Sequence, residues 1–367
     1  MSMWDYINDL PQLQHVELNN IVTLGEGHTP LVPSPNLGPS VGLRQLFFKL
    51  ESANPTGSYK DRFAAAAVAD MRQRGQSLCL ATSRGNTGAA LAAYCAAASM
   101  KCKIAVVENA PQGKVRQMRA YGAELYTVRE FGPNSTVNQQ VMEGLAGLVR
   151  QGRGALQISA FCYSPIGMHG VQTIAYELAA QRPQGIQHVF CSAGGGGLTL
   201  AIARGFEQLG TSGKLTRGPA VECVQPQGNN TIAGPLAQGQ DRAQSVSCTT
   251  SISGLQVANV LDGNQTISAC RASGGSGHLV SDETVYEVQQ RLAREDGIFC
   301  EPAAAVTVAG ALQAWREGRI AEDATVVCLI TGTGFKDEKA LQRLGDGPLP
   351  CLNSAAEVPD FVAGSGT

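Results

Sequence analysis

The chain has 367 residues, a formal net charge of −2 and an apolar fraction of 43%. This balance offers no basic field for a nucleic acid or a membrane surface, and the length suits two packed α/β domains. The eleven cysteines include no C-x-x-C pair, so we expect reduced thiols and no metal site. The N-terminus resembles no signal peptide and no window spans a bilayer, which predicts a cytoplasmic protein.

Short apolar runs alternate along the chain with Ala-rich stretches of helical period. Strands are predicted at 46–50, 78–82, 103–107, 124–128, 155–159, 188–193, 220–224 and 325–331. Helices are predicted from near 59, from about 86, near 114, over roughly 136–150, near 170–178 and after the glycines that follow 193. Strands that are apolar on both faces and are followed by helices indicate parallel sheets covered on both sides.

Residues 226–280 depart from this alternation. They are rich in Gly, Ser, Asn and Gln and carry little periodicity. A long irregular stretch of this kind is either surface loop or part of an active site or interface, and the sequence leaves both open. The tail from Gly345 onward is rich in Pro, Gly and Ser, which predicts loose packing.

A turn signal, NPTG at 54–57, places Tyr59 and Lys60 at the start of a helix that follows a strand. A lysine at a helix start is usually a surface cation. A lysine held in a desolvated pocket has a lowered pKa and can form a Schiff base. The fixed position between strand and helix favours the second interpretation for Lys60.

Two more segments open helices after strands. In SRGNTG (83–88), Ser83, Asn86 and Thr87 stand where free N–H groups can bind a carboxylate, although the segment taken alone favours an ordinary helix cap by Ser83 or Asn86. In CSAGGGGL (191–198), Gly194, Gly195, Gly196 and Gly197 can turn backbone N–H groups toward a phosphate. The run matches neither the Walker pattern nor the dinucleotide-binding pattern.

A fourth glycine-rich turn follows the last strand, in CLITGTGFKD (328–337). Thr331 lies at the strand end, where its hydroxyl could meet a ring nitrogen. Ligands in open α/β sheets collect at the carboxyl ends of the strands, so the four segments are expected to converge on one crevice.

Together the four segments resemble those of the fold type II, tryptophan-synthase-β-like enzymes that use pyridoxal 5′-phosphate, and most closely the threonine synthase group. NPTGSYKDR (54–62), SRGNTG (83–88) and TGTGFKD (331–337) carry the resemblance. Weaker matches follow in family order: GEGHTPLVP (25–33), GKVRQMRAYGAELY (113–126), GVQTIAYE (170–177) and DGIFCEPAAAV (296–306).

The resemblance implies two doubly wound parallel-sheet domains, which we place at 1–73 with 164–367 (large, cofactor-binding) and at 74–163 (small, substrate-binding). Lys60 would bind the cofactor as a Schiff base and later move the Cα proton. The cofactor would be held by Tyr59 near its ring, Asn86 at the 3′-oxygen, Gly194–Gly197 at the phosphate and Thr331 at the pyridine nitrogen. Ser83 and Thr87 would hold the substrate carboxylate. A threonine in place of an acid leaves the pyridine neutral, which favours elimination and replacement over transamination.

The departures from threonine synthase lie on the substrate side. Where that group has an arginine and a lysine, SPIGMHGVQT (164–173) has Gly167 and Gln172. Two cations suited to a substrate phosphate are missing, which argues against O-phosphohomoserine. Arg84 and His169 are new, and we expect them to bind the substrate, with Arg84 at a second anionic group. The simpler alternative is that Arg84 lies on the surface.

The sequence therefore predicts a lyase that acts by β/γ-elimination or replacement on a small amino acid, without a nucleic-acid or membrane partner. A homodimer is expected from the resemblance. A serine/threonine dehydratase, favoured by the AGGGGL loop, a threonine synthase proper and a non-catalytic amino-acid-binding protein of the same fold remain alternatives. The substrate, the leaving group and the incoming nucleophile are left open.

Overall fold

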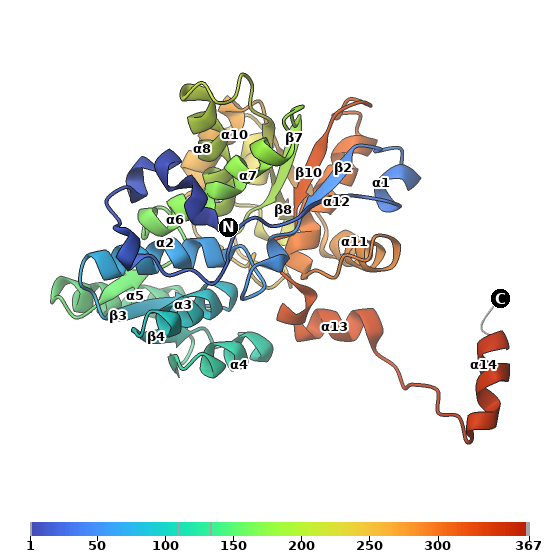
Figure 1. The fold of residues 1–367 in the computed structure, drawn as a ribbon, viewed down its shortest axis with the longest axis horizontal. Helices are drawn as coiled ribbons and strands as arrows, with labels where there is room; N and C mark the ends of the chain where they lie inside the picture. The colour runs from blue at the N-terminus through green and yellow to red at the C-terminus, as the bar shows by residue number, and fades with distance from the viewer. Residues whose placement is uncertain (1, 109, 133, 365–367) are drawn as a thin grey trace.

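The fold is described from a computed structural model, which covers residues 2–108, 110–132 and 134–364. Two sheets form its framework (Figure 1). The larger has the order β1 (Leu31–Pro33), β2 (Leu46–Lys49), β10 (Val326–Leu329), β7 (His188–Ser192), β8 (Ala220–Pro226), β9 (Gly277–Val280). The smaller has the order β5 (Glu124–Thr127), β4 (Lys101–Val106), β3 (Leu78–Ser83), β6 (Ala155–Gln157).

All strand pairs within the two sheets are parallel except β1 with β2 at one edge. The predicted pair of parallel sheets is thus confirmed, and each predicted strand is present to within a few residues. One sheet uses segments between 31 and 49 and between 188 and 329, and the other lies between 78 and 157. The domain boundaries themselves stay a prediction.

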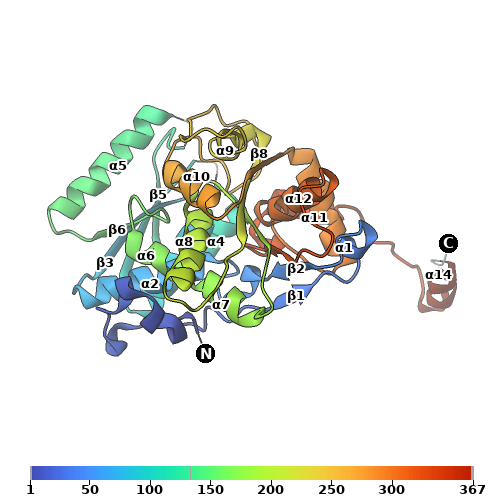
Figure 2. The ribbon, with the colours of Figure 1, turned by 90° about the horizontal axis from the view of Figure 1, so that it is seen from above.

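The helices cover both faces of the sheets (Figures 1 and 2). They are α1 (Leu37–Ser40), α2 (Lys60–Gln73), α3 (Asn86–Ala97), α4 (Gln112–Ala120), α5 (Ser135–Arg150), α6 (Pro165–Val171), α7 (Thr173–Gln181), α8 (Gly197–Thr211), α9 (Ala233–Ala237), α10 (Gly263–Ala272), α11 (Asp282–Glu295), α12 (Pro302–Arg316), α13 (Glu338–Gly345) and α14 (Val358–Gly364). The helix expected near 170–178 is two helices, which meet at Gln172.

Burial on both faces explains the apolar strands. Along β7, Val189 and Cys191 belong to the core under α8, whereas Phe190 between them belongs to the core under α11 and α12. Such a strand has no solvent face, and its sequence therefore shows no alternation. The helix α2 packs between α6 and α3 and joins the two sheets (Figure 1).

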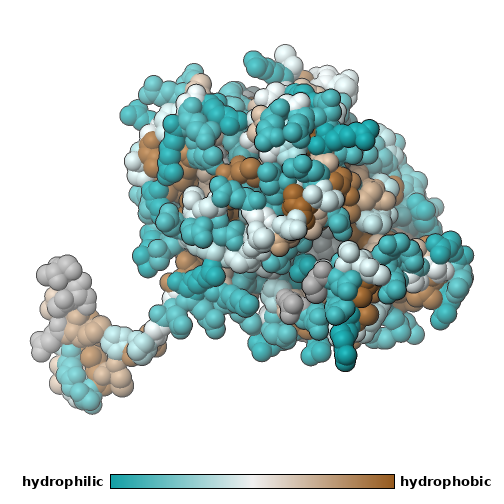
Figure 3. Space-filling view, turned by 180° about the vertical axis from the view of Figure 1, so that it is seen from behind, coloured by the Kyte–Doolittle hydropathy of each residue, from teal (hydrophilic) through white to brown (hydrophobic). Residues whose placement is uncertain are grey.

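Residues 226–280 are more regular than their composition suggests, since they include α9, α10 and β9. The part between α9 and α10 has no regular element. The tail beyond α13 leads to α14, which stands off the body (Figures 1 and 3). In the described part of the chain, no helix has the length and apolar character needed to cross a membrane.

Candidate active site

A cavity of about 290 Å³ lies where the carboxyl ends of strands from both sheets meet. Ser83 ends β3, Ser192 ends β7, and Thr331 follows β10, and all three line the cavity. This is the position in which parallel sheets collect ligands. Segments far apart in the sequence thus converge on one crevice.

Lys60 is the first residue of α2, and its backbone is fixed from both sides. Gly57 adopts φ +86°, which favours glycine, and the next residue, Ser58, bridges to Gly332. The N–H of Tyr59 then donates to the carbonyl of Thr331 at 3.1 Å. The turn therefore places the lysine between the last strand and the cavity.

The amine of Lys60 donates to Ser159 Oγ at 2.7 Å and lies 4.4 Å from the centre of the Tyr59 ring. Burial lowers the pKa of Lys60 to about 7, although the carboxylates of Glu301 and Asp262 oppose the shift. A large part of this lysine is therefore neutral near pH 7, as a nucleophilic amine requires.

The SRGNTG segment forms a tight turn into α3. The hydroxyl of Ser83 accepts from the N–H groups of Gly85 and Gly88, both at 2.9 Å. Ser83 thus caps the helix, while Thr87 Oγ1 lies 2.9 Å from Ser159 Oγ inside the cavity. A Cβ at Gly85 would lie 2.0 Å from Lys114 Cδ, so no larger residue fits there.

Asn86 is the first residue of α3, and within the described chain only the nitrogen of its side-chain amide has a hydrogen-bond partner. Its Nδ2 donates to Glu301 Oε1 at 2.8 Å, and the other oxygen of Glu301 accepts from Lys114 Nζ at 3.2 Å. Asn86 Oδ1 is buried without a hydrogen-bond partner among the described residues. A buried amide oxygen left open in this way indicates that a ligand group belongs beside it.

The four glycines connect β7 to α8. Gly196 adopts φ +94°, and a Cβ on it would lie 2.4 Å from Thr266 Oγ1. A Cβ on Gly195 would lie 2.8 Å from Leu261 Cδ1. The run therefore needs glycine for its conformation and for close packing, and it leaves the N–H groups at the start of α8 beside the cavity.

Arg84 also lines the cavity, with its side chain half-buried. Its Nη1 donates to the neutral oxygen of Gln256 at 3.3 Å, and within the described residues no carboxylate pairs with it. Burial lowers the pKa of this guanidinium, with a smaller opposing effect from Cys248. Arg84 is thus a partly desolvated cation at the cavity wall.

His169 lies elsewhere. Among the described residues that line the cavity His169 is absent, and its Nδ1 pairs with Gln172 Oε1 at 2.9 Å. Its ring packs edge-on against Phe161. Gln172 caps the C-terminus of α6, three positions after His169, which explains why the two side chains meet.

Sequence reasoning missed five polar side chains that line the cavity: Thr82, Lys114, Ser159, Ser192 and Glu301. Ser159 closes the predicted strand 155–159, so the rule that places ligands at strand ends could have found it. Glu301 and Lys114 lie at helix starts, and they join the site only through tertiary packing, in which Glu301 accepts from both Asn86 and Lys114. The irregular segment contributes Gly254, Leu255, Val257 and Leu261 to the same cavity.

Comparison with known proteins agrees with this geometry. The model of the family described as pyridoxal-phosphate dependent enzymes matches residues 22–332, which include the lysine, the glycine run and Thr331. The chain belongs to this family.

This chain is similar to threonine synthases over nearly its whole length. The protein of that name from Methanocaldococcus jannaschii is 32% identical over 354 residues, which are 95% of this chain and 84% of the relative. The threonine synthase of Halalkalibacterium halodurans is 30% identical over an alignment of 373 positions that covers 99% of each chain. These relatives make this chain a threonine-synthase-like lyase of the family.

Solved structures share its fold. Threonine deaminase isoform 2 from Solanum lycopersicum superimposes with a TM-score of 0.73 at 21% identity, over 94% of this chain and 92% of that one. A pyridoxal 5′-phosphate-dependent aspartate racemase gives a TM-score of 0.68 at 24% identity, over 89% and 95%. At these identities the likeness concerns the fold alone.

The residues present fit the cofactor of the family. The glycine run gives N–H groups that suit its phosphate, and the open oxygen of Asn86 faces the same cavity. Lys60 gives an amine with a lowered pKa. Pyridoxal phosphate is therefore the cofactor of this enzyme, and Lys60 would be the amine that binds it.

Proposed function

We propose that this enzyme eliminates or replaces a leaving group on a small amino acid that carries a second anionic group. Arg84 carries the proposal, because it is a partly desolvated guanidinium at the cavity wall without a carboxylate partner in the described chain. A charge in this position gains most from an anion that enters with the substrate.

Two hydroxyl groups near the amine support a proton-transfer role for Lys60. Ser159 Oγ bonds to both the amine of Lys60 and Thr87 Oγ1, and it fixes the amine at one point. The cofactor, when bound, accepts the charge that remains at Cα after proton removal. Lys60 would take that proton, since its pKa of about 7 lets the amine act as a base near neutral pH.

The substrate carboxylate is assigned to the start of α3. Ser83 uses its hydroxyl for the cap, so the remaining N–H groups of the turn and the Thr87 hydroxyl are the better donors. A carboxylate there gains from the helix dipole. This would place the substrate's side chain toward Arg84.

A threonine synthase proper is the less favoured alternative. Gly167 lies against α2, where a Cβ would be 2.5 Å from Phe63 Cε2, and Gln172 is buried against His169. These two positions supply no cation to a substrate phosphate. Arg84 could still meet a phosphate, so O-phosphohomoserine belongs among the test substrates.

A serine/threonine dehydratase is the second alternative, favoured by the AGGGGL sequence of the cofactor loop. Substrates of that kind have no second anion and would leave Arg84 unpaired. A non-catalytic amino-acid-binding protein is opposed by the complete set of Lys60, Asn86 and glycine run. The homodimer and the cytoplasmic location also stay predictions.

The test is a substrate screen on the cofactor-loaded enzyme, scored by release of phosphate, ammonia, a keto acid or sulfide. The panel pairs neutral amino acids, such as serine, threonine and O-acetylserine, with anionic ones, such as O-phosphoserine, O-phosphohomoserine and β-substituted aspartates. We expect an anionic substrate to turn over with the highest kcat/KM. A preference for serine or threonine would replace the proposal with the dehydratase.

Arg84→Ala is then compared with Arg84→Lys on the preferred substrate. Loss of a charge-assisted contact costs about 1.5–3 kcal/mol, so kcat/KM should fall roughly ten- to a hundredfold in the alanine variant and less in the lysine variant. Arg129→Ala, an exposed arginine of the same half of the chain, is the matched control and should leave kcat/KM unchanged. If kcat/KM is unchanged in Arg84→Ala, Arg84 does not bind an anionic group of the substrate.

A further inference from the structure

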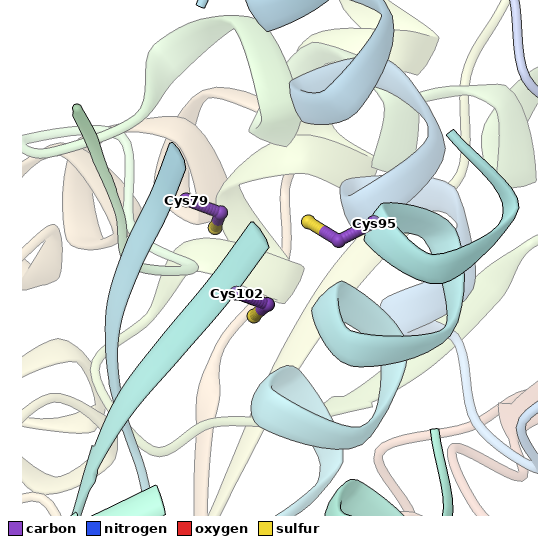
Figure 4. A group of neighbouring side chains, drawn as sticks. All are labelled: Cys79, Cys95 and Cys102. Atoms are coloured by element: carbon purple, nitrogen blue, oxygen red, sulfur yellow. The ribbon is translucent and has the colours of Figure 1, made fainter. Parts of the chain in front are cut away.

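Three of the eleven cysteines meet inside the half of the protein built on the smaller sheet (Figure 4). Cys79 lies on β3 and Cys102 on β4, where they are direct partners in the parallel register. Cys95 lies on α3 and points its sulfur toward the two strands. The three sulfur atoms all lie within 4.8 Å of one another.

The cluster is closed to solvent. Cys79 and Cys95 are 0% exposed and Cys102 is 6% exposed, in a core of Ala, Val and Ile side chains. Across the described residues, no histidine or carboxylate joins the three within the same distance. The available donors are therefore three sulfurs, which are soft ligands.

We propose that Cys79, Cys95 and Cys102 bind one thiophilic d¹⁰ cation, Zn²⁺ or Cu⁺, through three thiolates. Three sulfurs that share such an ion at about 2.3 Å lie about 4 Å apart, so the observed spacing needs little contraction. Binding breaks the three S–H bonds and releases three protons to solvent. The net charge left in the core is −1 with Zn²⁺ and −2 with Cu⁺.

Sequence spacing gave no sign of this cluster, because the three cysteines come from three elements and form no C-x-x-C motif. An ion there would join β3, β4 and α3. The same β3 and α3 carry Ser83, Asn86 and Thr87 at the cavity. The proposal is independent of the substrate assignment, since its readouts are metal content and stability.

The experiment refolds the full chain with Zn²⁺ or, anaerobically with a reductant, with Cu⁺, because a buried site is loaded as the chain folds. Free ions are removed and bound metal is counted by elemental mass spectrometry. We expect about one ion per chain in at least one arm, together with a higher melting temperature than the metal-free protein. The arm that loads identifies the ion, and failure of both arms overturns the proposal.

Cys79→Ala and Cys102→Ala should lose the ion, whereas Cys328→Ala, a buried cysteine of the other sheet, should keep it. X-ray absorption on the wild-type protein makes the test independent of variant folding. A shell of three sulfurs at about 2.3 Å supports the site. A shell with nitrogen or oxygen ligands, or full loading of the Cys79 and Cys102 variants, contradicts it.

Discussion

At the scale of single residues, Lys60 shows how position and environment create reactivity together. A turn that requires glycine at Gly57 holds the lysine at the head of α2, and Ser159 holds its amine. Removal from water then lowers its pKa to about 7. The carboxylates of Glu301 and Asp262 raise the pKa of Lys60, but burial outweighs them, so the amine can act as a base at neutral pH.

The pKa of Lys60 predicts how fast the metal-free, cofactor-free enzyme takes up pyridoxal phosphate covalently. The neutral amine is the reactive form, so the rate should rise as pH approaches about 7 and level off above it. Stopped-flow absorbance over pH 5.5–9.5 measures this rate. A rate that still climbs tenfold per pH unit above pH 8 would indicate an ordinary lysine, and Lys60→Ala should show no covalent uptake.

Local motifs explain which site residues could be predicted. Lys60, Asn86 and the glycine run lie in segments whose turn and helix-start signals can be recognised without the fold. Ser159 closes a predicted strand, so the strand-end rule could have indicated it, whereas Glu301 and Lys114 reach the cavity only through tertiary packing. His169 drew attention as an unusual residue, yet its ring turns to Gln172 on the same helix.

At the scale of elements, the link from β7 to α8 depends on glycine for two separate reasons. Gly196 needs a positive φ, and its missing Cβ leaves room for Thr266. Gly213, just after α8, has φ +73° with open space around it. A substitution at Gly213 therefore tests the effect of the positive φ alone. A substitution at Gly196 adds the effect of a steric contact.

Gly196→Ala should weaken pyridoxal phosphate binding at least tenfold, because the loop must shift to relieve the contact with Thr266. Gly213→Ala should leave cofactor affinity unchanged and should lower stability by about 1 kcal/mol through backbone strain alone. Cofactor titration and urea unfolding of both variants measure these effects. Equal affinity in the two variants would show that the cradle tolerates the shift.

Close packing also explains why one strand was not predicted from the sequence. A Cβ on Gly277 of β9 would lie 1.8 Å from the carbonyl oxygen of Ala233 in α9, and one on Gly275 would lie 2.0 Å from that of Val221. Backbone carbonyl oxygens this close to the Cβ position leave room for glycine alone. The segment therefore has the composition of a loop although it completes the sheet.

At the scale of the whole molecule, a buried ion network ties distant parts of the chain together. Arg62 of α2 pairs with Glu51 at 2.7 Å and with Glu177 of α7 at 2.6 Å, and Lys49 of β2 pairs with Glu177 at 2.6 Å. All four side chains are at most 1% exposed. Loss of one partner leaves a buried charge without compensation.

Glu177→Gln should therefore lower the free energy of unfolding by about 3–5 kcal/mol. Denaturant unfolding measures it, and Glu124→Gln, which breaks the exposed pair with Lys103, should leave stability unchanged. A shift of less than 1 kcal/mol in Glu177→Gln would mean that the network rearranges around the loss.

The ionisation of Glu177 predicts how the stability of the protein falls at acid pH. Burial alone would raise the pKa of Glu177, but Arg62 and Lys49 outweigh it and lower the pKa from 4.5 to about 2. Its stabilising contribution is therefore complete above about pH 4.5 and is lost as pH falls toward 2. Unfolding curves from pH 6 to 2 should show this loss in the wild-type protein and a weaker one in Glu177→Gln.

The contact between Gly167 and Phe63 has a consequence for how specificity could change over time. An arginine at position 167 would collide with the Phe63 ring and with its carbonyl oxygen, 3.1 Å from the added Cβ. That cation could arise only after α2 and α6 had moved apart, or after Phe63 had become smaller. Packing in the core thus constrains the order in which mutations can accumulate. A substitution of Gly167 by arginine alone would destabilise the protein and would give no new substrate specificity.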